Sequence, residues 1–252
     1  MAVSSRPRAC SCLERYRVPV GARVAVGLVS LVLISGAGCR SEVPTSDLVV
    51  ATRELGSIVE VDGILARDGG YSGVAFDRSI WLFGDSILAE PDADGSAWRH
   101  NTWSHSQDFW AADGLGPFVT PLDDPGGPAE LFPYTAEELA FNQAHAPHDP
   151  DCEDPCGARR MLWPLDIIAK PSSNDALVFY AKLGGEPGAW NFWSIGSSVA
   201  IWSEFEFGPV RPVLDDSSDE PTLLFHSPEP AFGQAAAQIP EGLATFGCLD
   251  TA

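Results

Sequence analysis

The chain has 252 residues and carries 15 Lys and Arg against 35 Asp and Glu, which gives a net charge of −20 at pH 7. This charge argues against a nucleic-acid backbone or an anionic membrane surface as a partner, because both would repel it. Apolar residues make up 45% of the chain, which argues against wholesale disorder. The 24 glycines and 21 prolines favour short strands joined by turns over a helical bundle.

The N-terminal segment is typical of a secretory signal. Residues 24–38 form an uncharged run of 15 residues, shorter than the roughly 20 that a membrane-spanning helix needs. A basic segment precedes this run and small residues end it, which is the layout of a cleavable signal peptide. The basic segment contains one acid, Glu14, and five arginines: Arg6, Arg8, Arg15, Arg17 and Arg23.

The small residues end at Cys39, and the four residues before this cysteine resemble the bacterial lipobox. The resemblance implies that Cys39 is acylated and becomes the mature N-terminus, although Gly36 stands where leucine is usual. We therefore expect residues 1–38 to be a lipoprotein signal peptide, residues 39–55 a tether and residues 56–252 the folded domain. The domain would be exported and held in the cell envelope by its lipid alone. An ordinary signal peptide or a short anchor is the alternative.

Three cysteines lie beyond the predicted lipid site. Export exposes them to oxidising conditions, in which cysteines can pair. Cys152 and Cys156 lie close together in a turn-rich loop, and we expect them to form a disulfide bond. Cys248 is then left without a partner, which indicates that the chain belongs to a longer one.

His145 and His148 precede this cysteine pair, so two imidazoles and two thiols could together bind zinc. Their spacing is not that of a common zinc finger, and an oxidising compartment favours a disulfide over free thiolates. We therefore expect no metal at this loop. No glycine-rich phosphate loop or dinucleotide motif is present in the sequence, so we expect no nucleotide cofactor.

The body of the chain repeats a strand–turn–strand plan three times, at residues 70–86, 165–183 and 233–249. Each segment predicts a β-hairpin, because turn residues separate two runs that are rich in strand-forming residues. Further strands are predicted at residues 101–106 and 197–207. Four antiparallel strands per unit is the plan of a propeller blade. A β-sandwich of unrelated hairpins is the alternative.

One helix is predicted, at residues 135–146. Thr135 can cap its N-terminus, and Glu138 stands three residues later, as in a capping box. Because the helix lies in a long insertion between two hairpins, we expect it to decorate the β core.

Five short motifs carry a resemblance to a family; they are residues 67–72, 81–85, 101–103, 162–164 and 232–234. They resemble an uncharacterised family of exported bacterial β-propeller proteins, similar in layout to five-bladed glycoside hydrolases such as arabinanases, β-xylosidases and levansucrases. A closed five-bladed propeller needs more than about 300 residues by that resemblance. The expected fold is therefore all-β, a five-bladed propeller that is incomplete, with about three blades and one short helical insertion.

The resemblance also implies a catalytic site, because in five-bladed glycosidases acids from the inner strands of successive blades converge on the channel mouth. Asp68 is expected to act as base or nucleophile, Glu229 as acid and Asp166 as the group that orients them. Arg67 would keep the carboxyl of Asp68 ionised. The alternative is that Asp68 accepts backbone hydrogen bonds in a turn, with Arg67 as its structural partner.

The expected substrate-binding residues come from the same motifs. Trp163 is expected to stack on a sugar ring, because exposed indoles form one wall of many ligand sites. The resemblance implies that Arg67, Asn101 and Gln234 also contact the substrate. Trp202 lies inside an apolar run, so we expect it in the core.

These residues predict a cell-envelope lipoprotein that binds or hydrolyses carbohydrate at the propeller mouth. A surface protein that binds a glycan or another protein without catalysis fits equally well, because propellers host many functions. A third hypothesis is an esterase, since residues 83–88 resemble the first block of the Gly-Asp-Ser-Leu family, with Ser86 as nucleophile. The late Asp-x-x-His motif of that family is missing from this sequence.

Overall fold

The computed structural model describes the backbone of Tyr16–Val18, the single residues Thr52 and Glu54, and residues 62–91, 95–123, 127–188, 190–240 and 242–248. The predicted lipid site Cys39, most of the predicted signal peptide and tether, and the side chain of Cys248 lie outside the described residues. Within the described part of the chain, no helix is both long enough and apolar enough to cross a bilayer.

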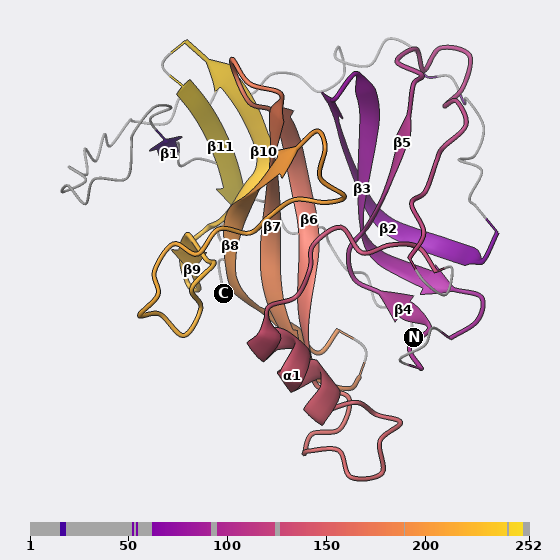
Figure 1. Ribbon diagram of the computed structural model, residues 1–252, viewed down its shortest axis with the longest axis vertical. Helices are drawn as coiled ribbons and strands as arrows, with labels where there is room; N and C mark the ends of the chain where they lie inside the picture. Colours follow the sequence, from indigo (N-terminus) through magenta and orange to yellow (C-terminus); the bar gives the residue numbers. More distant parts are fainter. Residues whose placement is uncertain are drawn as a thin grey trace, which may run out of the picture.

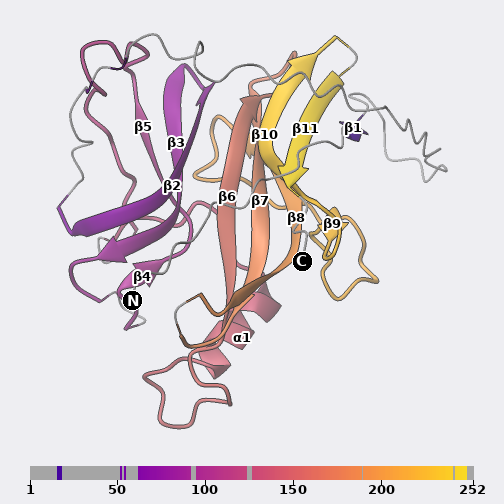
Figure 2. The same ribbon diagram turned by 180° about the vertical axis from the view of Figure 1, so that it is seen from behind.

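The described residues form three antiparallel sheets and one helix, which confirms the expected all-β class with a short helical insertion (Figures 1 and 2). The first sheet has four strands: β2 (Ile64–Ala75), β3 (Arg78–Leu88), β4 (Trp98–Arg99) and β5 (Thr102–Ser106). Strand β3 pairs with each of the other three. The second sheet has strands in chain order: β6 (Arg159–Ala169), β7 (Asp175–Gly185), β8 (Phe192–Ser203), β9 (Phe225–His226). The third sheet has the order β1–β11–β10: β1 (Tyr16–Val18), β11 (Gly242–Cys248), β10 (Ala231–Ile239). Helix α1 (Ala136–Ala144) lies between β5 and β6 in the chain.

The three predicted hairpins are confirmed: β2 pairs with β3, β6 with β7, and β10 with β11. The first turns through Phe76 and Asp77, which both have positive φ, at 54° and 52°. Two consecutive residues of positive φ match the right-handed twist of the strands that they join. In the second hairpin the turn is closed by the Lys170 amide, which donates to the Asp175 carbonyl at 2.9 Å.

The strand predicted at residues 197–207 was wrong at both ends. β8 begins earlier, at Phe192, because it pairs with β7 along the whole length of that strand. It ends at Ser203, where the chain turns and the Glu206 amide donates to the Ser203 carbonyl at 2.9 Å. The aromatic residues beyond Ser203 had suggested further strand, but Phe205 is 92% exposed.

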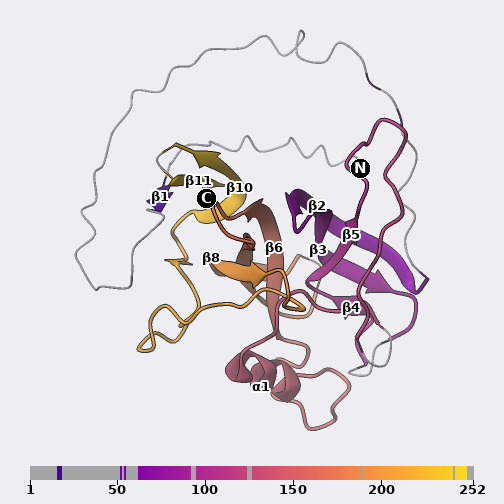
Figure 3. The same ribbon diagram turned by 45° about the horizontal axis from the view of Figure 1, so that its top comes forward.

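The first strand of each hairpin lies beside the first strand of the next, so that β6 has β2 on one side and β10 on the other (Figure 3). The Ala236 amide of β10 donates to Asp166 Oδ2 of β6 at 2.6 Å. Two residues further along β10, Gln238 Nε2 donates to the Ala169 carbonyl at 2.8 Å. From the first contact to the second, the residue number rises on both strands, so β6 and β10 run in the same direction.

β2 is tied to both of these strands. A Cβ atom at Gly73 would lie 2.5 Å from the Ile167 carbonyl oxygen, so only glycine allows β2 to approach β6 this closely. The Tyr71 hydroxyl donates to Gln234 Oε1 of β10 at 2.6 Å and so connects the first sheet with the third. Tyr71 also packs against both hydrophobic clusters of the core.

The larger hydrophobic cluster lies between the first two sheets. It includes Trp202, which is buried as predicted and meets Trp103 edge to face with ring centroids 4.7 Å apart. Fully buried members are Ile80, Leu82, Leu131, Phe132, Leu162, Val178 and Tyr180. The smaller cluster fills the other face of β6 and β7, and includes Met161, Leu165, Phe179, Ala181, Leu183 and Leu243. Burial of apolar surface on both faces of the second sheet makes it the centre of the fold.

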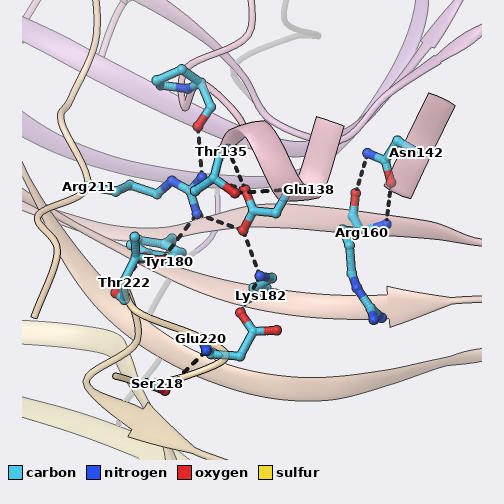
Figure 4. Close-up of polar contacts among 11 residues, drawn as sticks. Thr135, Glu138, Asn142, Arg160, Tyr180, Lys182, Arg211, Ser218, Glu220 and Thr222 are labelled. Atoms are coloured by element: carbon cyan, nitrogen blue, oxygen red, sulfur yellow. Dashed lines mark hydrogen bonds and ion pairs between the residues drawn. The ribbon is translucent and has the colours of Figure 1, made fainter. Parts of the chain in front are cut away.

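Helix α1 begins as predicted, because Thr135 caps it and Glu138 completes the capping box. The expectation that the helix only decorates the core was wrong. Glu138 is buried and points from α1 into the molecule, where Arg211 and Lys182 bind its carboxylate (Figure 4). Lys182 also contacts Glu220, and Arg211 donates to the Pro133 carbonyl at 2.9 Å. This buried ion cluster fastens the helix to β7 and to the loop after β8.

Candidate functional site

The first strand of each hairpin carries a bulge, and the bulges hold three residues of the predicted site. The register shifts around Asp68 in β2, around Asp166 in β6 and around Gln234 in β10. A bulge turns a side chain out of the regular alternation and is common next to functional sites. Because β2, β6 and β10 lie side by side, the structure places these residues at matching points of neighbouring strands.

Asp68 and Asp166 differ in their surroundings. Asp68 is exposed, and its Oδ1 accepts a hydrogen bond from the Gly69 amide at 2.7 Å. Asp166 is half-buried, and its two oxygens accept from the amides of Ile167, at 2.8 Å, and Ala236, at 2.6 Å. Burial raises the pKa of Asp166 even though the two amides favour its charged form. Asp166 thus joins β6 to β10, whereas the carboxylate of Asp68 faces solvent.

Glu229 does not join this group. It is exposed in the turn between β9 and β10, where its Oε2 accepts from the His226 amide at 2.8 Å. Ala236, which binds Asp166, comes seven residues later in the chain. Glu229 precedes the start of β10, whereas Ala236 lies past the middle of that strand.

The side chains of Arg67, Asn101 and Gln234 all make contacts within the protein. Arg67 donates to the hydroxyls of Ser104, at 2.7 Å, and Thr120, at 3.3 Å. Asn101 is fully buried, and its Oδ1 accepts from a backbone amide at 2.7 Å. Gln234 Oε1 accepts from the Tyr71 hydroxyl of β2. These contacts hold strands and loops together.

Trp163 begins a row of aromatic side chains that becomes more exposed along its length. Its ring centroid lies 5.2 Å from that of Phe192, which lies 6.3 Å from that of Trp190. Trp190 is 87% exposed. Phe192 pairs with Gly185 of β7 in the ladder. We call Trp163, Phe192 and Trp190 the aromatic row.

At its inner end, the aromatic row contacts a carboxylate, because Trp163 is hydrogen-bonded to Asp85 of β3. Its Oδ1 accepts hydrogen bonds from Trp163 Nε1, at 3.1 Å, and from His100 Nδ1, at 2.9 Å. Burial would raise the pKa of Asp85, but the hydrogen bonds from His100, Trp98 and Trp163 outweigh it and lower the pKa. Asp85 therefore stays ionised and holds both rings in place.

His100 has a fixed tautomer. Arg159 Nη1 lies 3.0 Å from His100 Nε2, and because arginine can only donate, Nε2 accepts. The proton of this neutral imidazole therefore sits on Nδ1, which donates to Asp85. Trp163, Asp85, His100 and Arg159 form one continuous hydrogen-bonded chain.

A cavity of about 470 Å³ adjoins the end of this chain that His100 and Arg159 form. It lies between β4, helix α1, the turn after α1 and the start of β6. Three of the five histidines of the sequence line it. Its lining includes Trp98, Arg99, His100, Glu130, Tyr134 and Arg159. A cavity of this volume is large enough for a small ligand.

The loop beside the cavity is closed by a disulfide bond between Cys152 and Cys156. His145 is buried, and its Nδ1 contacts the Glu153 carbonyl at 2.8 Å. Bonded to each other, the two cysteines are not thiolate ligands of the kind that zinc needs. Within the described part of the chain, no three His, Cys, Asp or Glu side chains are grouped to hold a metal ion.

The esterase hypothesis requires a histidine beside Ser86. Ser86 is fully buried, and its Oγ forms a hydrogen bond of 2.7 Å with Thr102 Oγ1. Successive side chains of a strand point to opposite faces, so Ser86 faces away from its neighbour Asp85 and from the histidine that Asp85 binds. This geometry gives the serine no base.

No family model matches the chain, and a search of curated proteins finds no significant match. The function therefore has to be inferred from geometry and chemistry.

The site can bind a polar ligand that also has an apolar face. The aromatic row offers flat apolar surfaces, and Asp85, His100 and Arg159 add hydrogen-bonding groups at its inner end. Asp85, His100, Arg159 and Tyr134 were not predicted as site residues, and Asp85 was noted only as part of the motifs at residues 81–85 and 83–88.

Proposed function

We propose that the chain is an exported, lipid-anchored protein that binds carbohydrate along the aromatic row. The single observation that carries this proposal is the series of tilted ring contacts from Trp163 to the exposed Trp190, joined to a carboxylate at its inner end. Sugar rings have an apolar face that stacks on aromatic rings and a rim of hydroxyls that carboxylates accept from. The location in the cell envelope, with lipid on Cys39, rests on the N-terminal sequence.

The proposal extends to the fold. We infer that the three sheets are successive blades of an incomplete five-bladed propeller. The support is that β2, β6 and β10 are neighbours, that each begins an antiparallel hairpin, and that each has a bulge at a matching point. The aromatic row would then lie at the rim of the central channel.

Trp190→Ala is expected to weaken carbohydrate binding by about fivefold, because an aromatic contact contributes about 1 kcal/mol. The measurement is binding of the purified domain to arabinan, xylan, levan and pectin by affinity electrophoresis. Phe205→Ala is the matched control, because Phe205 is equally exposed and makes no ring contact with another described residue. Equal retardation of wild type and Trp190→Ala on every polysaccharide would contradict the proposal.

Binding is favoured over hydrolysis by the surroundings of the three acids. Both oxygens of Asp166 accept backbone amides, and Glu229 closes a distant turn. We expect Asp68→Asn to leave affinity within about twofold of wild type, because the exposed Asp68 carboxylate lies outside the aromatic row. Reducing-sugar release from the same polysaccharides is the second measurement. Release that is lost in Asp68→Asn would establish hydrolysis through Asp68 instead.

A further inference from the structure

The cavity beside His100 has an arginine with no acidic partner among the described residues. Arg159 lines the cavity, and within the described part of the chain no carboxylate lies within ion-pair distance of it. The only hydrogen bond that its guanidinium makes there goes to His100. Four of its five N–H donors therefore have no protein acceptor among the described residues.

Two other arginines nearby, Arg99 and Arg211, are paired with acids. Arg99, in the same cavity wall, lies 3.1 Å from Asp123 and 3.7 Å from Glu130. Arg211 binds Glu138 with both of its terminal nitrogens. In a chain of net charge −20, an unpaired arginine that faces a cavity indicates that the acceptor comes with the ligand.

Tyr134 supplies a second donor to the same cavity. Its hydroxyl has no hydrogen-bond partner among the described residues. Burial, followed by the negative charges of Glu130 and Glu138, raises its pKa well above the ordinary value. The hydroxyl therefore stays protonated. Arg159 and Tyr134 line the same cavity.

The cavity also has an aromatic wall and acceptors. Trp98 lines it and is 42% exposed. Glu130, which Arg99 neutralises, can accept hydrogen bonds from hydroxyl groups. The ligand that fits these walls has a carboxylate, an apolar ring face and several hydroxyls.

We propose that this cavity binds a sugar that carries a carboxylate, a uronic acid. The carboxylate lies against the guanidinium of Arg159 and accepts a hydrogen bond from the Tyr134 hydroxyl, while the sugar ring lies on Trp98. The inference rests on the proposed function in one respect, that the ligand is a carbohydrate. It narrows the ligand to an acidic sugar, and it assigns the cavity as a second binding site in addition to the aromatic row.

The test is isothermal titration of the intact chain with galacturonate, with galactose as the neutral analogue and with inorganic phosphate. We expect galacturonate to bind at least tenfold more tightly than galactose. Arg159→Gln should abolish this preference, because it removes the charge and the paired donors that a carboxylate requires. Arg160→Gln is the matched control, since Arg160 is the next residue and its guanidinium lies on the Phe141 ring.

Three results would overturn the inference. One is equal affinity for galacturonate and galactose, and another is a preference that survives in Arg159→Gln. Binding of phosphate but not of galacturonate would assign the cavity to a phosphorylated ligand. Tyr134→Phe removes one hydroxyl only and should weaken galacturonate binding several-fold even if Arg159→Gln does not fold. Neutral polysaccharides that still bind the aromatic row would show that only this inference, and not the proposed function, has failed.

Discussion

Glu138→Gln is expected to lower the free energy of unfolding by about 3–5 kcal/mol, the usual effect of removing one partner from a buried ion pair. Lys182 and Arg211 are 6% and 3% exposed at their side chains. Among the described residues Glu138 is the carboxylate that pairs with Arg211, and Lys182 is shared between Glu138 and Glu220. Glutamine keeps the shape and the helix cap but leaves these two cations without that charge. Urea denaturation at pH 7 measures the change.

The matched control for this variant is Glu137→Gln. Glu137 is the preceding residue, in the first turn of the same helix, but it is exposed. We expect a change within about 0.5 kcal/mol, as for most surface substitutions. Equal unfolding midpoints for the two variants would mean that the buried ion cluster contributes nothing to stability.

Acid is expected to destabilise the protein through the same carboxylate. Burial would raise the pKa of Glu138, but the hydrogen bonds and charges of Arg211 and Lys182 outweigh it and lower the pKa from 4.5 to about 2. A group whose pKa is lower in the folded state stabilises that state above its unfolded pKa. This contribution, roughly 3 kcal/mol, is present above pH 4.5 and is lost as the pH falls towards 2.

Urea midpoints at pH 5, 4, 3 and 2 measure this loss. Asp85 and other carboxylates with lowered pKa values add to it, so the comparison that matters is with Glu138→Gln. That variant has no carboxylate to protonate at this position and should lose about 3 kcal/mol less than wild type over the same range. Parallel curves for the two proteins would contradict the low pKa of Glu138.

The hairpins could be predicted from the sequence because strands and turns are local. Turn residues such as Asp77 interrupt strand-forming runs, and the capping box of α1 spans only the four positions from Thr135 to Glu138. The role of the helix could not be predicted in this way. Arg211 is 73 residues from Glu138, and no local pattern links the two. The end of β8 was predicted too late because exposed aromatic residues follow Ser203, such as Phe205, and aromatic residues are common in strands.

The same distinction applies to the site. The three bulged strands could be anticipated from short motifs that resemble a known layout, and Asp68, Asp166 and Gln234 do lie at matching points. The pairing of Asp85 with His100 was overlooked. Antiparallel pairing of Ser86 with Arg99 places the flanking residues 85 and 100 side by side, so a correct register for β3 and β4 would have revealed it.

The hydrogen bond between Tyr71 and Gln234 has a consequence for how the chain is made. Its two partners are 163 positions apart, and β6 must already lie between their strands before they can meet. Contacts of such long separation are slow to form, because a long loop has to close first. During synthesis from the N-terminus, the face of β6 that β10 covers therefore stays bare until Ala231–Ile239 has been made, about 60 residues after β6.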